Sequence, residues 1–310
     1  MPYPNAPFTT AEPPRANRTG LGIGLMLLGF MFFAVADVTA KVLTENLHAF
    51  QIAWFRQLGL LSAALWFLAA RGPAVLKSRR PALQVARGCA AAMSASAFVF
   101  AVGYVPLPDA VAVSFVAPFM VTILAALVLR ETVGIRRWTA VTIGFIGTLI
   151  VIRPGLGLFH PAIFVVLVAA SLFAARQILS RVLGPVDATM TTVTYTAISS
   201  VVLLTVPMIW VWRTPAGLDQ ALLLVLIACA AGVGELLIIR ALELAEAATV
   251  APLQYTMIVW SSGFSWLVFA QLPDFWTLVG AAIIMASGIY TLHRERLAIR
   301  ARRAGMPSPQ

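Results

Sequence analysis

Residues 32–43 read FFAVADVTAKVL, and residues 172–183 read LFAARQILSRVL. The two stretches lie about 140 residues apart, and the same offset relates a second pair of short strings elsewhere in the chain. Several matches at one offset are much rarer than single matches, even in an apolar chain, so they predict an internal duplication. The matching strings are Phe33-Ala34 with Phe173-Ala174, Lys41-Val42-Leu43 with Arg181-Val182-Leu183, and Cys89-Ala90-Ala91 with Cys229-Ala230-Ala231.

The composition places the chain in a membrane. Apolar residues make up 60% of its 310 positions, charged residues make up 11%, and the mean hydropathy is +0.90. A hydrocarbon core about 30 Å thick needs ~20 apolar residues per helix. The apolar runs are continuous rather than alternating, which indicates helices and not barrel strands. We expect ten spans, at about 20–43, 49–70, 84–104, 109–130, 136–152, 161–183, 188–212, 219–241, 247–270 and 275–292.

The duplication divides the ten expected spans into five and five. An odd number of spans in each half forces the second half to enter the bilayer with the opposite orientation, as in many secondary transporters. The predicted fold is therefore an all-α integral membrane protein with ten transmembrane helices in two inverted five-helix repeats, 20–152 and 160–292. Residues 1–19 hold five prolines and no apolar core, so we expect a disordered cytoplasmic tail. Residues 294–310 read as a basic cytoplasmic tail.

The net charge of +10 is explained by topology. Lys and Arg concentrate on one side of the ten-span arrangement, and loops rich in these residues stay cytoplasmic. We therefore expect both termini in the cytoplasm, a multi-pass protein of the inner (plasma) membrane, and contact with anionic lipids at the cytoplasmic face. Nucleic acid is not an expected partner. The loop charges are Arg71, Lys77, Arg79, Arg80 and Arg87, then Arg130, Arg136 and Arg137, and then those from Arg294 to Arg303.

An ordered set of local strings resembles the EamA-type members of the drug/metabolite transporter superfamily. In the first half these are LPDAVAVSFVAP (107–118), LRET (129–132) and RRWT (136–139), and in the second half RALELA (240–245), TVAPLQYT (249–256) and WTLVG (276–280). The resemblance covers about residues 20 to 293. It implies that the first, third, fourth, sixth, eighth and ninth helices surround a central cavity for small organic molecules. The chain departs from the pattern where Glu131 corresponds to Gln271 and Pro106 to Glu246.

Two pairs of opposite charges lie within the expected spans. Charged groups inside a membrane cost roughly 2.5–3.5 kcal/mol each on insertion scales, so they should be paired, snorkelling or functional. Asp37 and Arg56 lie at similar depth near one surface, and Arg176 and Glu235 do so near the other. Each pair can be a structural bridge, a gate or a substrate contact. Lys41, one turn beyond Asp37, competes for that carboxylate or, as we favour, snorkels to the interface.

The fourth and ninth expected spans carry polar, aromatic and proline residues. Pro118 and Pro252 each remove a backbone donor, so we expect kinks that expose backbone polar groups. As a set, hydroxyl and aromatic side chains on these helices and on the third favour a substrate with a planar part and several hydrogen-bonding groups. For any one of them helix packing is the better explanation. The candidates for substrate binding are Ser94, Ser114, Phe115, Gln254, Tyr255 and Trp260, beside Asp37, Arg56, Arg176 and Glu235.

The predicted function is secondary transport of small organic metabolites by alternating access. Amino-acid derivatives and nucleoside-like or flavin-like vitamins fit the expected lining best. The histidines His48, His160 and His293 are dispersed, so we expect no metal, no cofactor and no enzyme activity. A sensor or scaffold and, with less support, a membrane-embedded enzyme are the alternatives, and a monomer is a possible state.

Overall fold

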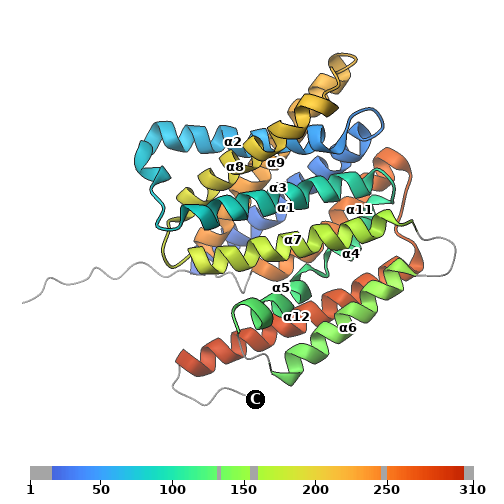
Figure 1. Cartoon of the computed structure of the whole chain (residues 1–310). Helices are drawn as coiled ribbons and strands as arrows, with labels where there is room; N and C mark the ends of the chain where they lie inside the picture. Colours follow the sequence, from blue (N-terminus) through green and yellow to red (C-terminus); the bar gives the residue numbers. More distant parts are fainter. Residues whose placement is uncertain (1–15, 131–133, 154–159, 246–249, 304–310) are drawn as a thin grey trace, which may run out of the picture.

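The computed structural model describes residues 16–130, 134–153, 160–245 and 250–303, and in these ranges every regular element is a helix. The helices run roughly side by side in one bundle (Figure 1). The first half contains α1 (Ala16–Leu43), α2 (Ala49–Arg71), the short 3₁₀ helix η1 (Pro73–Leu76), α3 (Pro81–Val102), α4 (Leu107–Ser114), α5 (Ala117–Val128) and α6 (Ile135–Ile152). The second half contains α7 (Ala162–Leu183), α8 (Thr189–Val211), α9 (Leu218–Leu244), the 3₁₀ helix η2 (Ala251–Thr256), α11 (Met257–Phe269) and α12 (Phe275–Arg303).

Seven segments of the described chain are long and apolar enough to cross a membrane. The prediction of spanning helices is thus confirmed for seven of the ten. The predicted spans 136–152 and 275–292 coincide with shorter apolar helices, Trp138–Ile152 and Phe275–Thr291. The predicted span 247–270 falls on η2 and α11, and its first residues lie outside the described ones.

Two helices expected to be continuous are interrupted, and both interruptions lie near a proline. The segment 107–128 breaks between Ser114 and Ala117, and Pro118 is the second residue of α5. In the second half Pro252 is the second residue of η2, whose 3₁₀ geometry changes to α-helix at Met257. Proline is tolerated in the first turn of a helix because the backbone N–H that it lacks would have no hydrogen-bond partner within the helix there. Ala248, four residues before Pro252 and the position whose carbonyl a kink would expose, lies outside the described residues.

The most extensive helix contacts join the two halves of the chain. α1 packs on α9, α3 on α7, α6 on α12, and α2 on both α8 and α9. Figure 1 shows α6 and α12 as a pair along one edge of the bundle. Since every one of these contacts joins a helix of the first half to one of the second, the halves form a single packed unit.

A glycine contact sets how closely α2 approaches α9. A Cβ atom added to Gly59 would lie 1.8 Å from the carbonyl oxygen of Ala228, and one added to Gly232 would lie 2.7 Å from the carbonyl oxygen of Gly59. Small residues at such crossings let the backbones of membrane helices meet directly. The separation between α2 and α9 therefore depends on the absence of a side chain at both positions.

Loop contacts tie the helices together at both ends of the bundle. At the end with the α1–α2 loop, called the Asn46 end, the side-chain amide of Gln51 donates to the carbonyl oxygen of Arg213 at 2.7 Å and accepts from its backbone N–H at 3.0 Å. At the other end, called the Asp187 end, the carboxylate of Asp187 accepts from Ser78 Oγ at 2.5 Å, Arg79 N at 2.9 Å and Gln84 Nε2 at 2.8 Å. Both contacts cross between the two halves.

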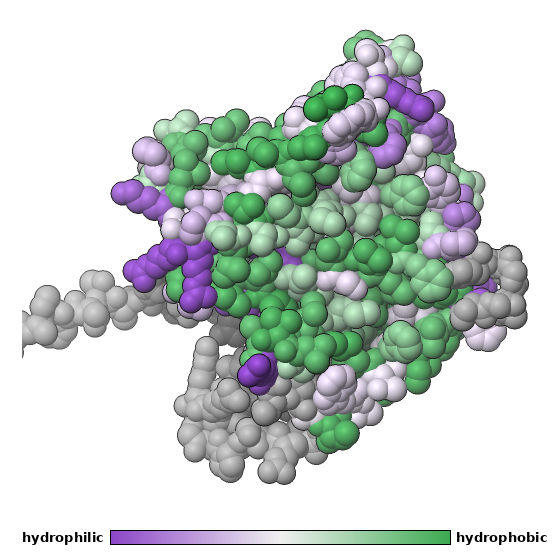
Figure 2. Space-filling view, in the orientation of Figure 1, coloured by the Kyte–Doolittle hydropathy of each residue, from purple (hydrophilic) through white to green (hydrophobic). Residues whose placement is uncertain are grey.

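The surface pattern agrees with a membrane setting. Figure 2 shows hydrophobic side chains across the middle of the visible face, over α5 and α7, and hydrophilic side chains gathered toward the two ends of the helices. Large exposed apolar residues of these two helices include Leu127, Val128, Phe164 and Val168. Exposed apolar area of this extent is expected where lipid, not water, covers a protein.

The contact at Asp187 is expected to persist throughout the physiological pH range. Hydrogen bonds from the Ser78 hydroxyl, then from Arg79 N and Gln84, lower the pKa of this carboxyl below its ordinary value. A carboxyl whose pKa is lowered by folding stabilises the folded state at every pH above its unfolded pKa of ~3.9. That stabilisation is lost only as the pH falls below this value. The difference in melting temperature between wild type and Asp187→Asn should therefore stay constant from pH 5 to 8 and shrink below about pH 4. Thermal unfolding in detergent measures it, with Ser78→Ala as the variant that removes the first donor; a difference that changes between pH 5 and 8 contradicts this assignment.

Candidate functional site

Asp37 and Arg56 form an ion pair between α1 and α2. Arg56 Nη1 donates to Asp37 Oδ1 at 2.5 Å, and the Asp37 side chain is almost fully buried. The guanidinium also lies over the ring of Phe33, 5.7 Å from its centroid. Asp37 is six residues before the end of α1, which places it ~9 Å from the Asn46 end. The structure thus brings together the two residues predicted to pair, and their charges cancel inside the bundle.

Lys41 does neither of the things expected of it. Its Nζ donates to the carbonyl oxygens of Val102 at 3.0 Å and Val105 at 2.7 Å, at the end of α3, and lies 5.5 Å from the centroid of Phe269. The last carbonyls of a helix have no partner within it and carry the negative end of its dipole. Lys41 therefore caps α3, and the expectations of snorkelling and of competition for Asp37 were wrong.

Arg176 and Glu235 face each other near the Asp187 end, but loosely. Arg176 Nη2 lies 3.7 Å from Glu235 Oε1, beyond ordinary hydrogen-bond distance. The two side chains are 22% and 23% exposed. Arg176 also contacts Phe173 through its guanidinium, and its buried Nε has no hydrogen-bond partner among the described residues. α7 packs mainly on α3 and α5, whereas α9 packs mainly on α1 and α2. The ion pair thus joins two helices that pack mainly on different neighbours.

Arg87 joins this second charged group, and sequence reasoning missed it. We counted Arg87 among the loop charges, although the third span was expected from residue 84. α3 begins at Pro81, so Arg87 lies almost two turns inside the helix and is 9% exposed. Its Nε donates to Ser180 Oγ at 2.7 Å and its Nη1 donates to Thr196 Oγ1. The signal that places it in the helix is Pro81, because proline favours the first helical position.

The predicted hydroxyl residues mostly bond to the backbone. Ser94 Oγ on α3 donates to the carbonyl oxygen of Ala169 on α7 at 2.8 Å, and Ser114 Oγ donates to that of Val111 at 2.7 Å. Ser94 therefore links two packed helices, whereas Ser114 satisfies the last turn of α4. Gln254 lies in η2 and is partly exposed.

The predicted aromatic residues meet where the two interrupted helices come together. The rings of Phe115 and Tyr255 lie edge to face with centroids 5.2 Å apart, and both side chains are buried. The Tyr255 hydroxyl and the Trp260 indole nitrogen are buried with no hydrogen-bond partner among the described residues. Buried polar atoms normally have partners, so these two groups can bond to a ligand or to water.

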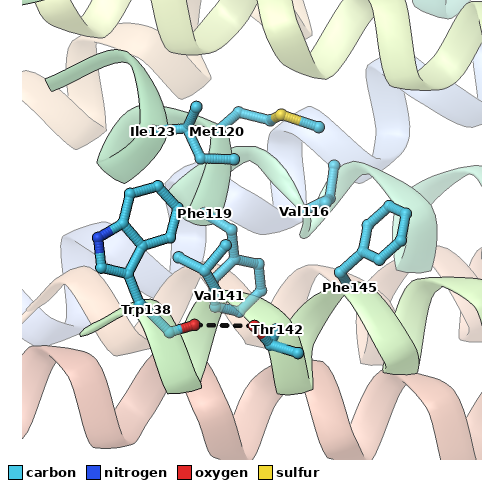
Figure 3. A pocket seen from close by; sticks show the side chains of 8 residues that line it. All are labelled: Val116, Phe119, Met120, Ile123, Trp138, Val141, Thr142 and Phe145. Atoms are coloured by element: carbon cyan, nitrogen blue, oxygen red, sulfur yellow. Dashed lines mark hydrogen bonds between the residues drawn. The ribbon is translucent and has the colours of Figure 1, made fainter. Parts of the chain in front are cut away.

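An apolar pocket of about 200 Å³ lies between α5 and α6, on a different part of the bundle from the charged groups. Figure 3 shows Trp138, Val141, Thr142 and Phe145 from α6 facing Phe119, Met120 and Ile123 from α5 and the preceding Val116. The Thr142 hydroxyl donates to the carbonyl oxygen of Trp138, as the dashed line marks, so its polar group is satisfied within α6. The lining therefore suits an apolar occupant such as a lipid chain, and it brings together none of the predicted substrate residues. In the described ranges no three His, Cys, Asp or Glu residues group closely enough to hold a metal ion.

Comparison with known proteins identifies the family. The EamA-like transporter family matches residues 20–153 and again residues 160–292. The chain is 30% identical over 281 residues to an S-adenosylmethionine uptake transporter of Rickettsia felis, covering 90% of this chain and 94% of the relative. It is 28% identical to the pseudopaline exporter CntI of Pseudomonas aeruginosa (86% and 94% covered) and 27% identical to a riboflavin transporter of Rhizobium johnstonii (94% and 96% covered).

A solved crystal structure matches the fold with a TM-score of 0.61 at 17% identity, covering 92% of this chain and 99% of the other. The named relatives all move small organic molecules, so the chain is a small-metabolite transporter of the membrane, as the sequence predicted. It belongs, with two repeats, to the EamA-like transporter family.

Proposed function

We propose that this protein is a secondary carrier of an amino-acid-derived metabolite that combines a carboxylate, a cationic group and a planar ring, with S-adenosylmethionine as the leading candidate. The observation that carries the proposal is the presence of two groups of opposite charges on different helices within the membrane-spanning bundle. Buried and half-buried charges are costly in a membrane, so their retention favours a role with a charged ligand.

The proposed architecture is ten spanning segments in two inverted five-helix repeats, with both termini in the cytoplasm of the inner membrane. Two family matches of similar length and the cytoplasmic bias of Lys and Arg support it. In this arrangement the Asp187 end is cytoplasmic and the Asn46 end faces outward. Alternating access would then expose the Asp37–Arg56 group to one side and the Arg176–Glu235 group to the other.

The chemistry of S-adenosylmethionine suits the residues that meet here. Its amino-acid carboxylate matches Arg176, its ammonium and sulfonium match Asp37 or Glu235, and its adenine can stack on aromatic side chains such as Phe115, Tyr255 and Trp260. Pro118 and Pro252 mark the interruptions beside these rings, where the helices would bend. Ser94, Ser114 and Gln254 would supply further polar contacts.

Transport by the purified full-length protein in proteoliposomes tests the proposal. We expect counterflow of radiolabelled S-adenosylmethionine to exceed that in protein-free vesicles by at least tenfold. An excess of unlabelled S-adenosylmethionine should compete, and equal concentrations of riboflavin or adenosine should compete less. Counterflow of riboflavin without counterflow of S-adenosylmethionine would contradict the proposed substrate while keeping the carrier, and silence toward a broad metabolite panel would contradict both.

A further inference from the structure

The charged group at the Asp187 end has an imbalance of charge. Arg87 is on α3, Arg176 on α7 and Glu235 on α9, and Arg87 bonds to α7 at Ser180, one turn beyond Arg176. The Ser180 hydroxyl accepts from Arg87 Nε at 2.7 Å and donates to the backbone carbonyl of Arg176 at 2.8 Å. The group thus holds two guanidinium groups and one carboxylate, and that carboxylate pairs with Arg176, which leaves one positive charge unbalanced.

Neither arginine has the partner that its charge calls for. Arg87 donates only to the neutral hydroxyls of Ser180 and Thr196, and in the described part of the chain it pairs with no carboxylate. The ion pair of Arg176 is 3.7 Å long, and its buried Nε lacks any partner in the same ranges. An uncompensated charge out of water is strongly destabilising, whereas guanidinium groups bind carboxylates with short, charge-assisted hydrogen bonds.

The group lies within the membrane-spanning part of the bundle. Arg87 is six residues after the start of α3, and Arg176 is seven residues before the end of α7, so both lie ~10 Å inside the bundle. α7 and α9 pack mainly on other helices, and the side chains of Arg176 and Glu235 are 22% and 23% exposed. The opposite group, Asp37 with Arg56, is already neutral at 2.5 Å.

We infer that Arg87 and Arg176 together form a binding site for the carboxylate of the transported molecule, and that Glu235 is the resident counter-ion that this carboxylate displaces from Arg176. The inference rests on the proposed function for the identity of the substrate, but it requires only that the substrate carry a carboxylate. It makes Arg87 a specificity-determining residue: the carrier selects carboxylates over otherwise identical molecules that lack them.

The test compares S-adenosylmethionine with its decarboxylated analogue, which keeps the adenosine, sulfonium and amine. Equilibrium binding to detergent-purified full-length protein should favour S-adenosylmethionine by at least tenfold in wild type. In Arg87→Gln and Arg176→Gln that preference should fall to about twofold or less, because affinity for S-adenosylmethionine drops while affinity for the analogue does not. Arg87→Lys keeps the charge without the two-point hydrogen bonding and should lie between.

The matched control is Arg240→Gln. Arg240 is also on α9, toward the same end, but it is exposed and pairs with Glu243 at 2.7 Å, so its loss should leave the preference unchanged. Elution at the wild-type volume and cooperative unfolding would show that Arg87→Lys is folded, and this variant then carries the test if Arg87→Gln does not fold. A preference for the carboxylate that persists in folded Arg87→Lys and Arg176→Gln, or that falls equally in Arg240→Gln, overturns the inference.

A second experiment distinguishes a wrong substrate assignment from a wrong assignment of the carboxylate site. If wild type binds neither S-adenosylmethionine nor its analogue, the proposed substrate is wrong. The site is then tested by thermal stabilisation with free carboxylates and their amides, namely methionine with methioninamide and succinate with succinamide. At least one carboxylate should stabilise wild type more than its amide does, and Arg176→Gln should abolish that difference. Equal effects of every acid and its amide on wild type overturn the inference.

Discussion

Gly59→Ala is expected to lower the melting temperature of the detergent-solubilised protein by about 5 to 10 °C. The added methyl group would lie 1.8 Å from the carbonyl oxygen of Ala228, and a backbone atom cannot rotate away as a side chain can. α2 and α9 must therefore separate, and overpacking of this kind costs ~1–3 kcal/mol or more. In a protein of this size each kcal/mol of destabilisation lowers the melting temperature by a few degrees, so a cost of ~3 kcal/mol gives the expected shift.

The matched control is Gly24→Ala, on α1. No atom lies within 4 Å of a Cβ built at Gly24, so the same chemical change there meets open space. Alanine is favoured over glycine inside a helix by ~1 kcal/mol, so Gly24→Ala should be neutral or slightly stabilising. Equal melting temperatures for the two variants would contradict the close approach of α2 to α9.

Asp37→Asn should abolish transport, with a loss of at least a hundredfold, and should also destabilise the protein. Removing one partner of a buried ion pair costs ~3–5 kcal/mol because the other charge stays buried without compensation. Arg56 would lose its counter-ion and keep its contact with Phe33. Counterflow in proteoliposomes measures the first effect and thermal unfolding measures the second.

A double variant separates the structural and transport roles of this pair. Asp37→Asn with Arg56→Gln leaves no unpaired charge, so stability should recover most of what the single variant loses. If the pair takes part in transport, the activity should stay low in the double variant. Recovery of both stability and activity would make the pair a structural bridge only. Asp219→Asn, which changes an exposed carboxylate at the start of α9, should affect neither.

The sequence predicted the spanning helices and the charged pairs because both depend on local pattern. Long apolar runs need no tertiary information, and the pairing of Asp37 with Arg56 follows from two neighbouring helices joined by a short loop. Arg176 and Glu235 are far apart in sequence, and they were matched by their depth from the helix ends. Depth alone could not give the 3.7 Å separation, which depends on how α7 and α9 sit on their different neighbours.

Arg87 and Lys41 were misplaced for a common physical reason. Both were assigned from charge, as residues that should stay near water, although each finds acceptors on other helices that no local pattern reveals. Lys41 bonds to carbonyl groups 61 and 64 residues away, and Arg87 bonds to hydroxyls 93 and 109 residues away. The approach of Gly59 to Ala228 is equally invisible in the sequence, because it depends on the crossing of α2 and α9.

The order of synthesis treats the two charged groups differently. Asp37 and Arg56 are 19 residues apart, so they can neutralise each other as soon as α2 has followed α1 into the membrane. Arg87 has no such neighbour. Ser180 and Thr196, which accept its hydrogen bonds, leave the ribosome 93 and 109 residues later. During that interval α3 must hold a charge near the lipid headgroups or within the insertion machinery. Completion of α7 and α8 is therefore the step that draws Arg87 into the bundle.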